Sequence, residues 1–392
     1  MRSIGLIPQI LIGVALGVVT GLVMPSVATS LGILGQLFVG MLKAVAPLLV
    51  MLLVMSAIAN RHESDHDARK TLMTIALYLV GTVSAAFIAL IMSSFFPQTL
   101  VLRDIAEGAP PVAVTAVLGN VLFSLIDNPV NALLTGNFLG CLSWAILLGI
   151  SFRKAPAVFK ENLSVLAGGV SDIVRYVIRL APVGIFGLVS FTVATTGVEV
   201  LGSYLSLAGL LVSCMVLMAL LVNPLIVFLL TRKNPYPLVF RCLEESGITA
   251  FFTRSSAANI PVNLALAKRL GISEELYAVT IPIGATVNMS GAAITITVLT
   301  MAVVQTLGIE VSLATALLLC VIAALSACGA SGVPSGSLLL VPLACSLFGI
   351  SYDVAMQVVA VGFIISVIQD STETALNSST DVVYTYAVDQ AG

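Results

Sequence analysis

The sequence predicts an all-α membrane protein with eight transmembrane helices and two opposed re-entrant helical hairpins. Of its 392 residues, 59% are hydrophobic and only 9% are charged, whereas soluble proteins average about 25% charged residues. Several apolar runs are long enough to span a bilayer, which takes about 20 residues. Two further apolar segments are interrupted by small and polar residues, as expected of hairpins that enter and leave the membrane on the same side.

The predicted spans are the apolar runs at 5–24, 33–59, 71–95, 117–150, 164–195, 202–231, 276–307 and 351–369. The first run is longer than the apolar core of a cleavable signal sequence, so we expect it to remain as a helix. A net charge of −2 gives no basic excess that would attract nucleic acid. Six scattered cysteines lie mostly within apolar runs, where we expect packing residues and no disulfide framework.

Positive charge predicts the topology. If the N-terminus is cytoplasmic, the inward loops hold twelve basic residues and the outward side holds only Arg103, as the positive-inside rule requires. This split holds only if the hairpin at 236–270 opens inward and the hairpin at 311–349 opens outward. Opposed hairpins that are each followed by a spanning helix form inverted repeats, which many secondary transporters use to build a site near the midplane. The twelve residues are Arg2, Arg61, Arg69, Lys70, Arg153, Lys154, Lys160, Arg232, Lys233, Arg241, Lys268 and Arg269.

A polar stripe runs along the predicted last helix, in the sequence IISVIQDSTETALNSSTD at 364–381. Its polar residues recur every three or four positions, which places them on one helical face. A carboxylate at the bilayer centre costs roughly 2.5 to 3.5 kcal/mol, so this face needs a cation, a donor or water opposite it. The alternative is that this segment is an amphipathic tail exposed to water, and the predicted membrane spans that precede it argue against that interpretation. The stripe consists of Asp370, Glu373, Thr374, Asn377 and Asp381.

Three breaks interrupt the apolar segments: RSSAANIP at 254–261, GATVNMSG at 284–291 and GASGVPSG at 329–336. Irregular backbone is tolerated at membrane depth only where protein buries it or where it lines a cavity. The first break offers serines and amide groups to a carboxylate, and Arg254 could neutralise Asp370, Glu373 or both. Local unwinding at the second break would free carbonyl oxygens for sodium. Helix packing explains any single break, but three breaks and an acidic stripe together predict a substrate and ion site.

The sequences GATVNMSG, SACGASGVPSG and QDSTETALNSSTD, taken together, closely resemble those of the dicarboxylate/amino acid:cation symporter family, and most nearly its bacterial sodium:serine/threonine symporters. The resemblance implies a homotrimer in the bacterial cytoplasmic (inner) membrane. It also implies a scaffold formed by 1–59 and 117–195, and a mobile transport unit formed by 71–96 and 202–388. Alternating access would carry the site across the membrane.

The resemblance further implies residue roles. Asp370 would bind the α-ammonium group of the substrate and Asn377 its α-carboxylate. The substrate-binding set is Ser255, Ser256, Val333, Asp370, Glu373, Thr374 and Asn377. The implied sodium ligands are Gly284, Asn288, Asn377 and Asp381 at one site, and Thr286, Met289, Ala327, Cys328 and Ala330 at a second. A third family site would use Tyr78, Thr82, Asn288 and an aspartate that is Ser290 here, and the loss of that charge weakens it.

Two departures from acidic-substrate relatives predict the substrate. In those relatives an arginine of the last helix and a threonine hold the side-chain carboxylate, and Glu373 and Ala292 stand at these positions here. A second carboxylate on the substrate would therefore meet a negative charge. We expect a sodium-coupled importer of small neutral amino acids, with serine and threonine as the expected substrates. The alternative is a sodium- or proton-coupled symporter of acidic amino acids or C4-dicarboxylates.

The polar stripe also raises two other classes of function, a membrane protease and a channel. In a membrane protease Asp370 and Asp381 would have to share one water, but eleven residues of helix separate them by about 16 Å, which is too far. A channel would pass substrate without saturating, which a transport measurement distinguishes from a carrier. The sequence therefore predicts a transporter and not an enzyme.

Overall fold

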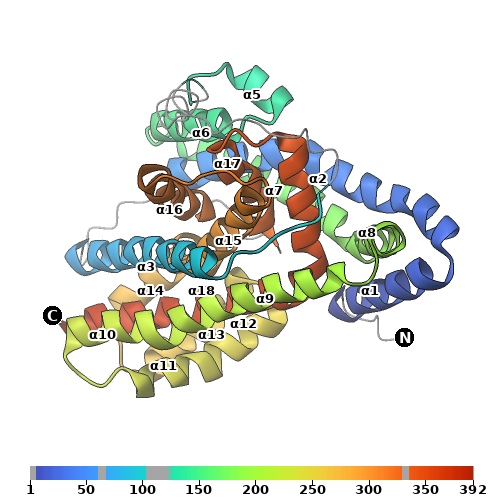
Figure 1. The fold of residues 1–392 in the computed structure, drawn as a ribbon. Helices are drawn as coiled ribbons and strands as arrows, with labels where there is room; N and C mark the ends of the chain where they lie inside the picture. The colour runs from blue at the N-terminus through green and yellow to red at the C-terminus, as the bar shows by residue number, and fades with distance from the viewer. Residues whose placement is uncertain (1–5, 61–67, 103–122, 124, 329–334, 392) are drawn as a thin grey trace, which may run out of the picture.

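In the computed structural model the described residues are 6–60, 68–102, 123, 125–328 and 335–391, and their elements are all helices (Figure 1). The prediction of an all-α protein is confirmed. The helices of the first half are α1 (Leu6–Val23), α2 (Pro25–Ala59), α3 (Ala68–Phe95), α5 (Pro129–Thr135), α6 (Phe138–Phe152), α7 (Ala157–Arg179) and α8 (Ala181–Thr196).

The second half begins with one long interrupted helix and continues with two hairpins, each followed by a predicted span. Its elements are α9 (Val200–Leu217), the π-helix η1 (Met218–Val222), α10 (Asn223–Thr231), α11 (Tyr236–Cys242), the π-helix η2 (Leu243–Gly247), α12 (Ile248–Thr253), α13 (Ser256–Arg269), α14 (Glu274–Val287), α15 (Ser290–Thr306), α16 (Leu313–Ala327), the 3₁₀ helix η3 (Gly336–Leu340), α17 (Val341–Ser346) and α18 (Tyr352–Ala391).

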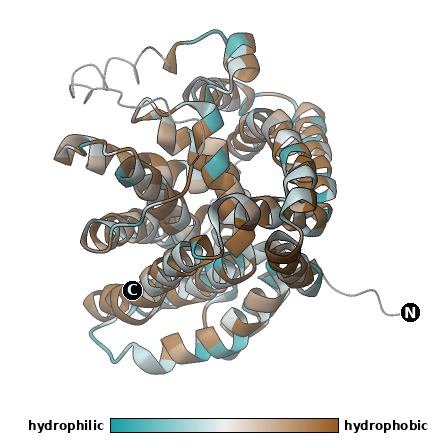
Figure 2. Ribbon diagram, turned by 45° about the vertical axis from the view of Figure 1, so that its right-hand side comes forward, coloured by the Kyte–Doolittle hydropathy of each residue, from teal (hydrophilic) through white to brown (hydrophobic). Residues whose placement is uncertain are grey.

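Several helices have the length and hydropathy of membrane spans. Within the described residues, five qualify on their own, and α7 and α8 qualify together as a pair bent by 49°. Hydrophobic residues run along nearly every helix in Figure 2. Large apolar side chains such as Leu16 of α1, Val80 of α3 and Leu205 of α9 remain more than half exposed. Such exposure is what helices that face lipid require, and the protein is a multi-pass membrane protein.

Close packing of small residues joins α1 to α8. Gly13, Gly17 and Gly21 recur every four residues along α1. A Cβ atom added at Gly13 would lie 2.5 Å from the carbonyl oxygen of Pro182, and one at Gly21 would lie 2.7 Å from Val193. Membrane helices use such stripes to bring their backbones into contact, because lipid supplies no hydrophobic driving force between them. The two helices therefore form one packed unit.

The site-bearing helices pack around α15. Every residue of α15 from Ser290 to Val304 is buried, although the helix is apolar enough to face lipid. It contacts α3, α16, α17 and α18, which surround it in Figure 1. Polar side chains on α15 therefore meet protein on every side, and this protected interior contains the candidate site.

Some sequence-based boundaries were wrong. The second predicted span, 33–59, begins eight residues earlier, because Pro25 occupies the first turn of α2, where its missing N–H costs nothing. The predicted span 117–150 is not one helix in its described part, since Gly136 at φ 67° ends α5 and Asn137 caps α6. The unwinding expected across 284–291 is limited to Asn288 and Met289, because Gly284 to Val287 remain helical.

Candidate functional site

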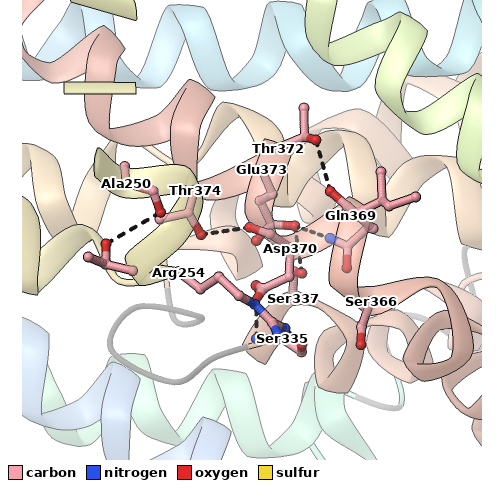
Figure 3. Close-up of polar contacts among 12 residues, drawn as sticks. Ala250, Arg254, Ser335, Ser337, Ser366, Gln369, Asp370, Thr372, Glu373 and Thr374 are labelled. Carbon is pink, nitrogen blue, oxygen red and sulfur yellow. Dashed lines mark hydrogen bonds and ion pairs between the residues drawn. The ribbon is translucent and has the colours of Figure 1, made fainter. Parts of the chain in front are cut away.

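Arg254 joins the tips of both hairpins to the last helix (Figure 3). It follows α12 with φ 51°, a left-handed conformation that turns the chain into α13. Its Nε donates to Asp370 Oδ2 at 2.6 Å, and its Nη2 donates to Ser335 Oγ at 3.1 Å. Ser335, also left-handed at φ 55°, donates its backbone N–H to Asp370 Oδ1 at 2.9 Å. Asp370 is therefore the point at which α18, the inner hairpin and the outer hairpin meet.

Glu373 lies one turn further along α18 and has neutral partners. Its Oε2 atom accepts from Thr295 Oγ1 at 2.8 Å, from Ser337 Oγ at 2.8 Å and from Gln369 Nε2 at 2.6 Å. Of the three pairings that the sequence allowed for Arg254, the structure shows the one with Asp370. The two carboxylates thus differ, because one is paired with a cation and the other with uncharged donors.

A second cluster forms where α14 ends and α15 begins. Asn288 donates from Nδ2 to Asp381 Oδ1 at 2.9 Å and to the carbonyl oxygen of Asn377 at 3.1 Å. Gly284 is so close that a Cβ atom there would lie 2.5 Å from Asp381 Oδ1. Gly284 and Asn288 at this break thus meet Asn377 and Asp381, about 90 residues later in the sequence, and all four were expected at one sodium site.

Unpartnered oxygen atoms at this cluster suit a cation. Asn288 Oδ1, Ser290 Oγ and Asp381 Oδ2 are buried, and none of them bonds to another described residue. A buried acceptor without a partner costs about 1 to 3 kcal/mol, and a charged one costs more. Carboxylate, carbonyl and hydroxyl oxygens are the ligands of hard cations. The donor set therefore fits a sodium ion.

Tyr78 of α3 borders the same cluster. The Tyr78 hydroxyl lies 3.2 Å from the carbonyl oxygens of Asp381 and Thr280 and 3.0 Å from Thr385 Oγ1. Thr82 donates its hydroxyl to the Tyr78 carbonyl at 2.7 Å. Of the two α3 residues expected at the third sodium site, Tyr78 thus contacts Asp381, and Thr82 lies one turn further along α3.

Three of the ligands expected at the second sodium site, Thr286, Ala327 and Cys328, lie at or next to the C-terminal ends of α14 and α16. Cys328 Sγ approaches the carbonyl oxygen of Val287 to 3.4 Å, so the end of α16 lies against the end of α14. Ala327 is buried, whereas the Thr286 side chain is exposed and donates to the carbonyl oxygen of Ile283. Met289 Sδ accepts from Asn377 Nδ2 at 3.5 Å. Ala330, like Val333 of the substrate set, lies outside the described residues.

The remaining predicted substrate residues bond within the protein. Ser255 caps α13 by accepting from Ala258 N at 3.2 Å, and Ser256, the next residue, is partly exposed. Thr374 donates its hydroxyl to the Asp370 carbonyl at 2.7 Å. Asn377 Oδ1 accepts from Gly291 N at 2.7 Å. All lie near the Asp370 junction or on α18, and their contacts with substrate stay a prediction.

Sequence reasoning missed four residues that contact the two carboxylates: Thr295, Ser335, Ser337 and Gln369. Gln369 stands four positions before Glu373, a spacing that places both on one helical face and could have identified it. Ser335 lies within the predicted break at 329–336, and Ser337 directly follows it. Thr295 carries no local indication, because its partner is 78 residues away.

Gly284→Ala should weaken sodium binding at the Asp381 cluster. Its methyl group would meet Asp381 Oδ1 at 2.5 Å and the Tyr78 hydroxyl at 2.9 Å, and overpacking of this kind costs about 1 to 3 kcal/mol. We expect the sodium concentration for half-maximal uptake to rise about tenfold. Gly168→Ala is the control, since a Cβ atom on that helical glycine meets nothing within 4 Å. Equal sodium dependence of the two variants would contradict this geometry.

A sequence model of the sodium:dicarboxylate symporter family matches residues 6–391, which is nearly the whole chain. Proteins of this family are membrane transporters and not enzymes, and their name identifies sodium as the coupling ion. The helical membrane fold and the buried oxygen cluster agree with that assignment. The chain therefore belongs to the sodium:dicarboxylate symporter family.

Proposed function

We propose that the protein is a sodium-coupled importer of small neutral amino acids, with serine and threonine as substrates, that works by alternating access. The observation that supports this proposal is the commitment of Arg254 to Asp370. A substrate with a second carboxylate needs a cation at the side-chain end of its pocket. In this structure the arginine at the site is bonded to Asp370 and Ser335, and Glu373 places another carboxylate beside them.

The substrate would bind between the hairpins and α18. Asp370 would accept its ammonium group and Asn377 would donate to its carboxylate, while Ser255, Ser256 and Val333 would cover it. Arg254 would have to yield one Asp370 oxygen to the ammonium group. Glu373 would then accept a hydrogen bond from a substrate hydroxyl.

Sodium would be the second transported species. Asp381, Asn288 and the carbonyl groups of Gly284 and Asn377 would hold one ion. Thr286, Met289, Ala327, Cys328 and Ala330 would hold another, and Ser290 leaves a third site at Tyr78 and Thr82 without its usual charge. Asn377 would belong to both the substrate and ion sites, so binding of either ligand should raise the affinity for the other, as linkage requires.

We further propose a homotrimer in a bacterial inner membrane, with the N-terminus in the cytoplasm. The scaffold would comprise residues 1–59 and 117–195, and the transport unit would comprise 71–96 and 202–388. The packing of α1 and α2 on α8, and of α15 on α3 and α18, supports this division.

Competition for uptake tests the substrate class. We expect saturable uptake of labelled serine into proteoliposomes only with an inward sodium gradient. Unlabelled serine and threonine should compete, and aspartate, glutamate and succinate should not. Equal competition by aspartate would mean that Arg254 is free to bind a second carboxylate, and the acidic-substrate alternative would replace this proposal.

Glu373→Gln should remove the preference for a hydroxyl group. A hydrogen bond to a charged acceptor contributes about 1.5 to 3 kcal/mol, so the preference for serine over alanine should fall about tenfold or more. Thr372→Val is the control, because that partly exposed hydroxyl donates only to the backbone of its own helix. An unchanged ratio of serine to alanine in Glu373→Gln would show that Glu373 does not contact the substrate.

A further inference from the structure

Gln369 is a buried amide that bonds to the side-chain end of the candidate pocket. It is fully buried on α18, one turn before Glu373. Its Nε2 atom donates to Glu373 Oε2 at 2.6 Å (Figure 3). The same atom donates to Thr295 Oγ1 at 2.8 Å. An amide nitrogen carries two hydrogens, and these two bonds use both of them.

The orientation of this amide follows from its neighbours. If nitrogen and oxygen were exchanged, Gln369 would place an acceptor 2.6 Å from a carboxylate oxygen, which is repulsive. In the orientation observed, Oε1 points away and has no partner among the described residues. An unpartnered buried oxygen is unfavourable. The amide keeps this orientation because the opposite one would place its oxygen against the Glu373 carboxylate.

Three donors therefore converge on one oxygen of Glu373. Thr295 comes from α15, Ser337 from the outer hairpin and Gln369 from α18. No described residue donates to the other oxygen, Oε1. A carboxylate fixed through one oxygen in this way has its second oxygen held at a defined position, ready to accept one more hydrogen bond.

We propose that Gln369 is a positioning residue that fixes the Glu373 carboxylate and thereby sets the selectivity for hydroxyl-bearing substrates. This inference rests on the proposed function, because it assumes that Glu373 accepts from the substrate side chain. Gln369 itself makes no contact with substrate. Its effect should therefore appear only for substrates that use Glu373, such as serine, and not for alanine, which lacks the hydroxyl.

Gln369→Met tests the proposal, because methionine has a similar length and no N–H group. We expect the KM for serine to rise about tenfold, while the KM and maximal rate for alanine stay within about twofold of wild type. The double variant Gln369→Met with Glu373→Gln should show the serine-to-alanine ratio of Glu373→Gln alone, since residues that act through one another are not additive.

The matched control is Ser371→Ala, which removes a buried polar group of the same helix that has no partner among the described residues. It should leave the serine-to-alanine ratio unchanged. If Gln369→Met reduces serine and alanine transport equally, Gln369 is only a packing residue and the proposal is overturned. Gln369→Asn is the second variant should the first not fold, because it keeps the amide but is one methylene too short, and it should cause the same selective loss.

Failure of the proposed function would look different. Wild-type protein would then take up succinate or aspartate and not serine, whatever happens in the variants. The positioning role of Gln369 could still be tested by competition for uptake. If Gln369 acts through Glu373, Gln369→Met and Glu373→Gln must change the relative competition by the unlabelled substrates in the same direction. Opposite or unrelated changes would overturn it.

Discussion

Asp381→Asn should raise the sodium concentration needed for half-maximal uptake by roughly a hundredfold and nearly abolish uptake at ordinary sodium levels. Asp381 supplies the formal charge at the oxygen cluster, and its Oδ2 has no partner among the described residues. Removal of one partner from a buried charge pair costs about 3 to 5 kcal/mol. Asparagine has nearly the same shape, so the protein should still fold. Uptake measured across a series of sodium concentrations gives the result.

Asp389→Asn is the control for this experiment. Asp389 lies near the end of the same helix, where it bonds to Ser273 at 2.9 Å and pairs with Lys70 at 3.5 Å. Its replacement should leave the sodium dependence of uptake unchanged. If Asp381→Asn retains the wild-type sodium dependence, sodium does not bind at this cluster.

Separate replacement of Arg254 by methionine and of Asp370 by asparagine should destabilise the protein more than the double replacement does. Both side chains are buried and bonded at 2.6 Å, so each single variant leaves the other group without its partner, at a cost of about 3 to 5 kcal/mol. The double variant removes both charges. Thermal unfolding of the detergent-solubilised protein should place its midpoint above those of the single variants. All three variants should lose serine uptake, because Asp370 would no longer be correctly paired or present.

The pair Arg175 and Asp172 provides the comparison. It has a similar bond length, 2.8 Å, but both side chains are about half exposed. Exposed pairs contribute about 0 to 1 kcal/mol, so Arg175→Met should hardly change the unfolding midpoint. Additive effects of the Arg254 and Asp370 replacements would show that the two groups do not stabilise each other.

The sequence was most informative where a property repeats along one helix. The spacing of Asp370, Glu373, Asn377 and Asp381 predicted a shared face, and α18 does bury all four. Hydropathy likewise located most of the spanning helices. Such features depend on neighbours a few residues away, and local spacing therefore suffices to predict them.

Local spacing and hydropathy could not predict the contacts between segments that are distant in the sequence. Arg254 had three possible pairings, and the choice of Asp370 depends on where a hairpin tip 116 residues away comes to lie. The partners of Glu373 come from three separate elements. The bend between α7 and α8 lies just before Pro182, which is in the first turn of α8, in a run that hydropathy alone presents as continuous.

The polar stripe of α18 also has a consequence for how the chain enters the membrane. An isolated segment with Asp370, Glu373 and Asp381 would be rejected by hydrocarbon at a cost of about 2.5 to 3.5 kcal/mol for each charge near the centre. Arg254, Asn288 and Thr295, which compensate these carboxylates, all precede α18 in the chain. During synthesis they are therefore already made when α18 emerges. Lateral partitioning of α18 from the translocon should thus depend on the helices inserted before it, so that the final step of insertion is also the step that assembles the site.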